Sequence, residues 1–262
     1  MKNWSLIIDK APLRGSLNMA VDEFLFNSVR ERKRTFLRFY HWEKPTVSLG
    51  CGQEAGRAVD LAFCRTHGID VVRRMTGGKV VLHLKELTYS LASSDTEMFT
   101  STLQESYELI SQALIEGLSF MGLSARLASA SSSTYVRATI PCFTLPARGE
   151  VVIGGRKIIG SAQKRAGATF IQHGSVPLDK EEALLKAVAR FDTKDTGVNM
   201  ASLTEAFGRP IAFDWATSRF ALGFSEFFGI KMKPLTFDEK TWQQISDIET
   251  VRYGNAAWTL KR

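Results

Sequence analysis

Apolar residues recur every three or four positions in several stretches of the chain, as they do along the buried face of a helix. Residues 16–32 carry such a stripe, and Ser16 stands where an N-cap is expected. The stripe consists of Met19, Val21, Phe24, Leu25 and Val29. A longer helix is predicted from Thr102, because Thr102 and Glu105 form the T-x-x-E pattern of a capping box. Further helices are predicted over residues 60–67, 180–190, 202–207, 214–228 and 238–249.

Shorter runs rich in β-branched and aromatic residues predict strands. They cover residues 4–9, 35–40, 46–49, 69–73, 80–84, 86–91, 150–153, 156–159 and 169–172. Gly77-Gly78 and Gly154-Gly155 each separate two of these runs, and a glycine pair between strands predicts a β-hairpin. Strands fill the first two thirds and helices gather at the end, which favours a mixed α/β domain around one sheet.

The composition is that of a globular protein, since 44% of the 262 residues are hydrophobic and 23% are charged. No apolar run approaches the roughly 20 residues that span a bilayer. The N-terminus shows neither an extended apolar region nor a small-residue cleavage site. We therefore expect one domain over residues 1–262 with its core at about 30–230, no membrane association and a cytoplasmic location.

The formal net charge of +7 predicts attraction to acidic partners. Lys and Arg are dispersed along the chain without a basic tract, so an acidic protein is favoured over nucleic acid. Cys51, Cys64 and Cys142 are too scattered for a disulfide framework and form no C-x-x-C pair, so no metal site is predicted. We expect Cys51 and Cys64 to be structural.

Cys142 lies between a serine-rich loop and the second predicted hairpin. One interpretation is a small core residue, because free cysteine is among the most buried residue types. The other is a nucleophile, because Lys157 is expected, partly enclosed, within that hairpin. A nearby ammonium group favours the thiolate and can polarise an acyl carbonyl. The alternative for Lys157 is a solvated strand lysine.

Two short segments after Lys157 can contribute to a binding site. The first, Gly160-Ser161-Ala162, has small side chains, so a ligand can approach its main chain and an oxyanion can bind there. The second is Gln172-His173-Gly174 at the end of a predicted strand. His173 is either a base or a hydrogen-bonded structural histidine.

The first predicted hairpin gathers cations around its glycine turn. It contains Arg74, Gly77, Gly78, Lys79 and His83. A glycine turn flanked by cations can cradle a phosphate, a pantetheine arm or a carboxamide. The spacing is neither a Walker A loop nor G-x-G-x-x-G, and a structural hairpin with surface charges is the alternative.

Taken in order, these stretches resemble the superfamily of lipoate–protein ligases, octanoyltransferases and biotin–protein ligases. The matching blocks are N-M-A-V-D-E near the start, P-T-V-S-L-G-C-G-Q at 45–53, R-R-M-T-G-G-K-V-V-L-H at 73–83, G-R-K-I-I-G-S-A-Q-K-R at 155–165 and Q-H-G-S at 172–175. E-L-T-Y-S at 86–90 and P-C-F-T-L-P at 141–146 are similar to the cysteine-dependent octanoyltransferases. The resemblance implies an α/β fold of the class II synthetase type, with a mixed sheet flanked by helices.

In that family a cysteine takes octanoate from octanoyl acyl carrier protein as a thioester. It then passes the chain to a lysine of a lipoyl-accepting domain or of glycine-cleavage H protein. The resemblance implies that Cys142 is this nucleophile and that Lys157 lowers its pKa and contacts the acyl carbonyl. It implies no cofactor, since thioester exchange needs no ATP. The residues that match the acyl pocket are Arg74, Gly77, Gly78, His83, Ser161, Ala162 and His173.

Lys79, Gly160, Gln172 and Gly174 complete the expected substrate-binding set, although Lys79 stands where many relatives have glycine or arginine. One alternative of the same fold is an ATP- and Mg²⁺-dependent lipoate ligase, but no separate C-terminal accessory domain is evident in the sequence. A second alternative is an amidotransferase that moves octanoyl groups between lipoyl domains. A third is a non-catalytic acyl-binding protein, against which the Cys142–Lys157 pair argues.

Overall fold

The computed structural model describes residues 2–31, 33–99, 102–129, 149–190 and 199–261. The strands are β1 (Asn3–Ile8), β2 (Thr35–Tyr40), β3 (Thr46–Leu49), β4 (Asp70–Arg73), β5 (Val81–His83), β6 (Glu86–Ser93), β7 (Arg126–Leu127), β8 (Val151–Ile153), β9 (Arg156–Ala166), β10 (Thr169–Pro177) and β11 (Lys231–Pro234). The helices are α1 (Gly15–Glu31), α2 (Ala55–Ala58), α3 (Leu61–Thr66), α4 (Leu103–Ser119), α6 (Glu182–Val188), α7 (Leu203–Phe207), α8 (Phe213–Phe228), α9 (Glu239–Ile248), the π-helix η1 (Glu249–Tyr253) and α10 (Ala256–Thr259).

The strands in these described ranges form two sheets. The large sheet has the order β11-β1-β2-β6-β10-β9-β8-β7, and the small sheet has the order β4-β3-β5. In the large sheet β1 is parallel to β2 and β11, and the other neighbours are antiparallel. The predicted mixed sheet flanked by helices is confirmed. The expectation of a single sheet is wrong, because β3, β4 and β5 pair only among themselves.

The small sheet also overturns the first predicted hairpin. β3 lies between β4 and β5, so the two strands predicted to pair with each other both pair with β3 instead. Their connection crosses the end of β3, where the N–H of Cys51 donates to the carbonyl of Thr76 at 2.8 Å. A Cβ on Gly50 would lie 2.1 Å from the carbonyl oxygen of Gly78, so the close crossing requires glycine.

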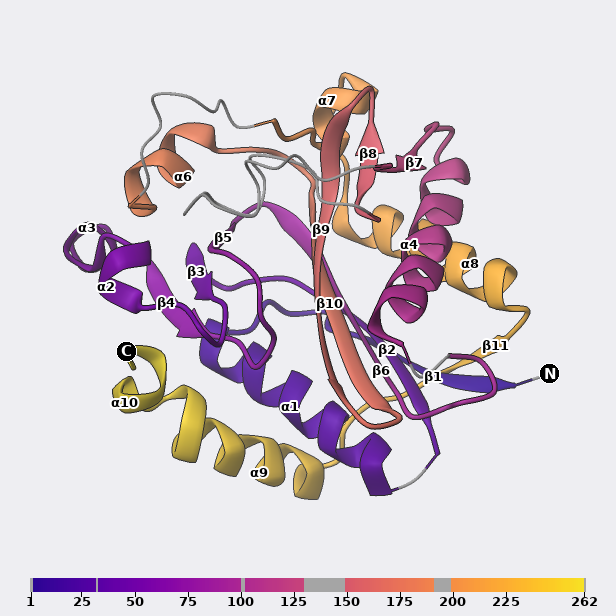
Figure 1. Cartoon of the computed structure of the whole chain (residues 1–262), viewed down its shortest axis with the longest axis horizontal. Helices are drawn as coiled ribbons and strands as arrows, with labels where there is room; N and C mark the ends of the chain where they lie inside the picture. Colours follow the sequence, from indigo (N-terminus) through magenta and orange to yellow (C-terminus); the bar gives the residue numbers. More distant parts are fainter. Residues whose placement is uncertain (1, 32, 100–101, 130–148, 191–198, 262) are drawn as a thin grey trace.

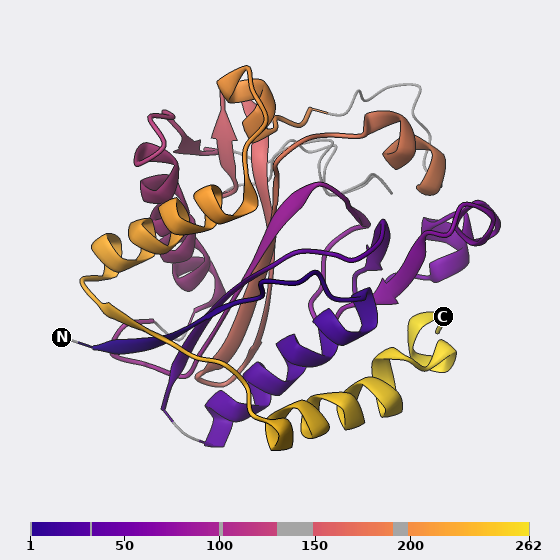
Figure 2. The ribbon, with the colours of Figure 1, turned by 180° about the vertical axis from the view of Figure 1, so that it is seen from behind.

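Helices cover both faces of the large sheet (Figure 1). On one face α4 and α8 pack against a core that includes Phe39, Tyr89 and Phe170 of the sheet. On the other face α1 lies against the sheet, and α9 packs on the outside of α1. Seen from behind, the small sheet sits beside the end of α1 (Figure 2). The molecule therefore has a layered architecture in which the small sheet adjoins one face of the large one.

Local signals placed most helix ends correctly. The Thr102 side chain accepts from the N–H of Glu105 at the start of α4, as the capping box predicts. The N-cap predicted at Ser16 is wrong, because α1 begins at Gly15. The hydroxyl of Ser16 instead donates to Oε1 of Glu249 at 2.5 Å. Ser16 therefore takes part in a long-range hydrogen bond and not in the helix cap that the local pattern predicted.

The second predicted hairpin is confirmed, since β8 and β9 pair as antiparallel neighbours around Gly154-Gly155. β9 and β10 extend further than predicted, to Ala166 and Pro177. They pair along the segment that contains both Gly160-Ser161-Ala162 and Gln172-His173-Gly174. In the described part of the chain, no helix has the length and apolar character needed to cross a membrane.

Candidate active site

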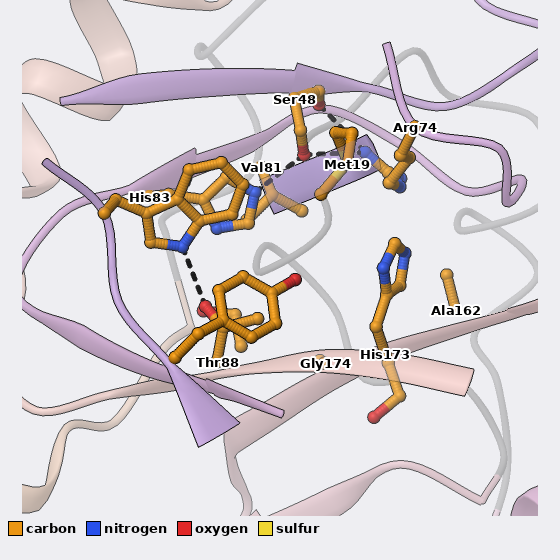
Figure 3. Close-up of a pocket in the computed structure, with 14 residues that line it drawn as sticks. Met19, Ser48, Arg74, Val81, His83, Thr88, Ala162, His173 and Gly174 are labelled. Carbon is orange, nitrogen blue, oxygen red and sulfur yellow. Dashed lines mark hydrogen bonds between the residues drawn. The ribbon is translucent and has the colours of Figure 1, made fainter. Parts of the chain in front are cut away.

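A narrow cavity lies between the middle of the large sheet and the small sheet (Figure 3). About 370 Å³ of space is free of protein atoms there, and this figure includes open solvent at the mouth of the cavity. Its lining residues are Met19, Tyr40, Trp42, Ser48, Arg74, Val81, His83, Thr88, Gly160, Ser161, Ala162, His173, Gly174 and Ser175. Mostly apolar walls with a few convergent polar groups are typical of sites for small ligands.

The cavity brings together residues that are far apart in sequence. The predicted binding residues that line it are Arg74, His83, Gly160, Ser161, Ala162, His173 and Gly174. Sequence reasoning missed the other lining residues, which are Met19, Tyr40, Trp42, Ser48, Val81, Thr88 and Ser175. They lie on α1, β2, β3, β5, β6 and β10 or just beyond them, where the pattern showed only ordinary core positions. Only the packing of the two sheets distinguishes these lining residues from other core residues.

Gly77, Gly78 and Lys79 do not line this cavity, and they contribute through their main chain. Arg74 donates from one terminal nitrogen to the carbonyl of Gly77 at 2.9 Å and to that of Lys79 at 2.7 Å. The other terminal nitrogen donates to the carbonyl and the hydroxyl of Ser48, at 2.9 and 3.0 Å. The buried guanidinium of Arg74 thereby fixes the loop against β3.

Gln172 points to the opposite face of the sheet from His173, because successive side chains of a strand alternate. Its amide donates to the hydroxyl of Tyr89 at 2.8 Å, and that hydroxyl lies 2.8 Å from Oγ of Ser161. Gln172 therefore lies behind the wall of the cavity. Gly174 exposes its main chain to the cavity, and a Cβ there would lie 2.5 Å from the Tyr89 ring.

Lys157 is completely buried and lies next to Glu150, which is 4% exposed. Its ammonium nitrogen donates to Oε1 of Glu150 at 2.6 Å. The main chain of Lys157 pairs with the 199–201 segment, which covers this part of β9. The alternative of a solvated strand lysine is therefore wrong. Cys142 lies outside the described residues, so its relation to Lys157 stays a prediction.

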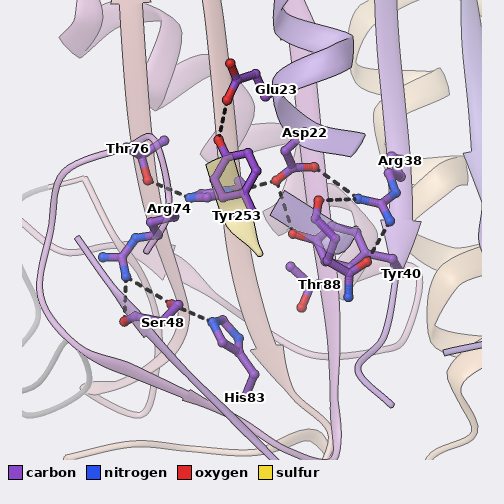
Figure 4. A network of polar contacts seen from close by, with 12 residues as sticks. Asp22, Glu23, Arg38, Tyr40, Ser48, Arg74, Thr76, His83, Thr88 and Tyr253 are labelled. Atoms are coloured by element: carbon purple, nitrogen blue, oxygen red, sulfur yellow. Dashed lines mark hydrogen bonds and ion pairs between the residues drawn. The ribbon is translucent and has the colours of Figure 1, made fainter. Parts of the chain in front are cut away.

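Asp22 on α1 and Thr76 in the loop that follows β4, both labelled in Figure 4, are connected through His173. Nδ1 lies 3.0 Å from Oδ2 of Asp22, and Nε2 lies 2.7 Å from Oγ1 of Thr76. Burial is the largest influence on the pKa of His173, and together with the neighbouring Arg74 and His83 it lowers this pKa below the usual value although Asp22 raises it, so the imidazole is neutral at pH 7. The carboxylate can only accept, so Nδ1 carries the proton and Nε2 accepts from Thr76. These bonds favour the interpretation of His173 as a structural histidine.

Asp22 is the centre of this buried network. Burial opposes its ionisation, but the hydrogen bond from His173 and the charge of Arg38 outweigh burial and lower the pKa of Asp22. Arg38 approaches Oδ1 of Asp22 at 3.2 Å and Oδ2 of Asp9 at 2.5 Å. Tyr40 donates its hydroxyl to Asp22 at 3.2 Å. The network joins α1 rigidly to the sheet beneath the cavity.

A second histidine, His83, lies on the other side of the cavity. Nε2 is 2.7 Å from Oγ of Ser48, and Nδ1 is 2.7 Å from Oε1 of Glu86. The indole of Trp42 stacks on the imidazole, with ring centroids 3.9 Å apart and planes 15° apart. Trp42 also donates to Oγ1 of Thr88 at 2.8 Å. Among the described residues no group of three or more acidic, histidine or cysteine side chains is arranged to hold a metal ion.

Comparison with known proteins places this geometry in context. The family described as "Lipoyl protein ligase A/B catalytic domain" matches residues 14–225. Octanoyltransferase LipM of Brevibacillus brevis is 32% identical over 277 residues, which cover 100% of both chains.

Solved structures show the same fold. A lipoate-protein ligase A bound with ATP has a TM-score of 0.85 at 22% identity and covers 99% of each chain. A bi-partite lipoate protein ligase of Thermoplasma acidophilum, described with its E2 lipoyl domain, has a TM-score of 0.81 at 24% identity. This second alignment covers 100% of the present chain and 98% of the other.

Proposed function

Because the chain belongs to the lipoyl protein ligase A/B catalytic domain family, we propose that it is an octanoyltransferase of protein lipoylation. The observation that carries the proposal is the identity of 32% over the full length of an octanoyltransferase LipM. The donor is octanoyl acyl carrier protein. The acceptor is a lysine of a lipoyl domain or of glycine-cleavage H protein.

The reaction proceeds in two steps through Cys142. The Cys142 thiolate attacks the donor thioester, which transfers the octanoyl group to Cys142 and releases the carrier as a thiolate that takes up a proton from solvent. The acceptor lysine then attacks the new thioester as a neutral amine, gives up one proton to solvent, forms the amide and expels the Cys142 thiolate. Each step exchanges one acyl bond for another, and the amide is the more stable product. The transfer therefore uses no ATP and no metal ion.

Lys157 has the chemistry to assist both steps. Its ammonium group is buried 2.6 Å from Glu150, and a carboxylate at that distance favours the charged form of a lysine. A buried positive charge stabilises a nearby thiolate and the negative oxygen of a tetrahedral intermediate. This supports the proposed role of Lys157 as the residue that lowers the pKa of Cys142.

The cavity supplies a place for the acyl chain. Met19, Val81, Ala162 and the rings of Tyr40 and Trp42 give it apolar walls. Burial of apolar surface contributes roughly 0.8 kcal/mol per methylene, so an eight-carbon chain gains enough free energy to be held there. The net charge of +7 supports binding of two acidic partners in turn, the acyl carrier protein and the acceptor domain.

Incubation with octanoyl acyl carrier protein in the absence of ATP tests the proposal. Intact-mass spectrometry is expected to show one octanoyl group on the protein, and Cys142→Ser is expected to lose it. A lipoyl domain added afterwards should remove the group from the enzyme and gain it. Labelling of the acceptor that requires free lipoate and ATP would instead identify a ligase. Loading only from an octanoylated lipoyl domain would identify an amidotransferase.

A further inference from the structure

Ser48, His83 and Glu86 form a continuous chain of hydrogen bonds along one wall of the cavity. The hydroxyl of Ser48 on β3 lies 2.7 Å from Nε2 of His83, at the end of β5. Nδ1 of the same imidazole lies 2.7 Å from Oε1 of Glu86, at the start of β6. Ser48 and His83 both line the cavity. A hydroxyl, a base and a carboxylate in this order are the arrangement that activates a serine nucleophile.

The other contacts of Glu86 fix the direction of every proton in this chain. Glu86 also accepts from the indole N–H of Trp42 at 3.1 Å, from the hydroxyl of Ser175 at 2.5 Å and from the hydroxyl of Thr88. A carboxylate can only accept, so Nδ1 of His83 donates to Glu86. In the neutral imidazole Nε2 then has a lone pair for the hydroxyl proton of Ser48.

Arg74 completes the surroundings of the hydroxyl. Its terminal nitrogen lies 3.0 Å from Oγ of Ser48, and it donates there because a guanidinium can only donate. Ser48 therefore directs its proton to His83 and a lone pair to Arg74. A positive charge at this distance stabilises negative charge that develops on the serine oxygen.

The second carboxylate–histidine pair shows why this serine is singled out. Asp22, His173 and Thr76 repeat the same order of groups with nearly the same distances. Thr76 and Ser48 are both completely buried with respect to bulk solvent, but Ser48 lines the cavity and Thr76 does not. Of these two chains, only the one through Ser48 ends where a ligand in the cavity can meet an oxygen nucleophile.

We propose that Ser48 is a second acyl acceptor, which gives the protein an esterase or thioesterase activity independent of Cys142. The Ser48 oxygen attacks the carbonyl of an acyl ester or thioester, and His83 takes the hydroxyl proton and passes it to the departing alcohol or thiol. Water then attacks the acyl-serine ester, His83 takes a proton from that water and returns it to Ser48, and a carboxylic acid leaves. The inference rests on the proposed function only in requiring that the cavity holds an acyl chain.

An octyl fluorophosphonate tests the inference, because it phosphonylates an activated serine and releases fluoride. The probe is applied to the Cys142→Ala protein, so that the proposed thiol nucleophile takes no part. We expect one phosphonyl group per chain, located on Ser48 by peptide mass spectrometry, and slow release of p-nitrophenol from p-nitrophenyl octanoate. His83→Gln should slow both reactions at least tenfold, since glutamine can bond to Ser48 and Glu86 but cannot take up the proton.

Thr76→Val is the matched control, since it removes the hydroxyl of the other chain and should leave the label on Ser48. Ser48→Ala should lose the label. If that variant fails to fold, the mapped position of the label and the rate in His83→Gln test the inference. Absence of a label, a label on another residue or an unchanged rate in His83→Gln would overturn the inference. Each of these results is independent of octanoyl loading at Cys142, which tests the proposed function separately.

Discussion

Lys157 and Glu150 form a buried ion pair in which Nζ and Oε1 are 2.6 Å apart. The two residues lie seven positions apart, at the two sides of the β8–β9 hairpin, and 0% and 4% of their side-chain surface is exposed. Loss of either partner of such a buried pair should lower the stability of the folded protein, because burial of one charge without the other is costly. The proposed chemistry of Lys157 therefore depends on Glu150.

Removal of the carboxylate should destabilise the protein strongly. Glu150→Ala leaves the buried ammonium without this partner, which typically costs about 3–5 kcal/mol. Urea unfolding at pH 7 measures the change. The control is Glu205→Ala, which removes a carboxylate from partly exposed pairs with Arg156 of the same hairpin and with Lys180, and it should cost at most about 1 kcal/mol. Equal losses in the two variants would contradict the special role of the buried pair.

A side chain at Gly174 should destabilise the protein, although strand positions usually accommodate side chains. A Cβ would lie 2.5 Å from the Tyr89 ring and 2.6 Å from Oγ of Ser161. We expect Gly174→Ala to cost about 1–3 kcal/mol through overpacking. Gly52→Ala is the control, since no atom lies within 4 Å of its Cβ position, and it should change stability by less than about 0.5 kcal/mol. Thermal unfolding that ranks the two variants equally would refute the expected clash.

The stability of the protein should fall between pH 7 and pH 5, in part through His173. Burial, together with Arg74 and His83, lowers the pKa of His173 in the folded protein although Asp22 raises it, so the unfolded chain binds the proton more readily than the folded protein. The stabilisation is therefore complete above the unfolded value of about 6.5 and is lost as the pH falls through the folded pKa.

Urea unfolding at several pH values measures this dependence. His173→Gln should flatten the fall between pH 7 and pH 5. His41, whose pKa burial also lowers, should account for part of the slope that persists. Identical slopes in the wild-type protein and His173→Gln would show that His173 takes up its proton equally well in both states.

A larger side chain at position 162 should shift the preference of the protein towards shorter acyl chains. Ala162 lines the cavity, so Ala162→Leu fills part of its volume. We expect kcat/KM for octanoyl transfer to fall at least tenfold and that for butyryl transfer to fall less, measured with acyl carrier proteins of each length. Ala166→Leu is the control, because Ala166 is an exposed residue of the same strand. An equal effect on both chain lengths would place the acyl group outside the cavity.

The sequence by itself determined the local elements of this protein. Helical periodicity placed most helices, and runs of β-branched and aromatic residues placed the strands other than β7 and β11. The hydroxyl of Thr102 fixed the start of α4. These signals act between residues a few positions apart. The glycine turn between β8 and β9 was equally local. The blocks that resemble the lipoyl ligase superfamily also identified much of the cavity lining in advance, including His83, Ala162 and His173.

Only the tertiary structure decided which elements are neighbours. Nothing local distinguishes the β4–β5 connection from a hairpin turn, yet β3 lies between the two strands because it pairs with both. The same holds for the partners of Lys157 and Ser48. A charged or hydroxyl side chain becomes a buried ion pair or an aligned donor only when a distant segment covers it, and strand periodicity carries no information about that segment.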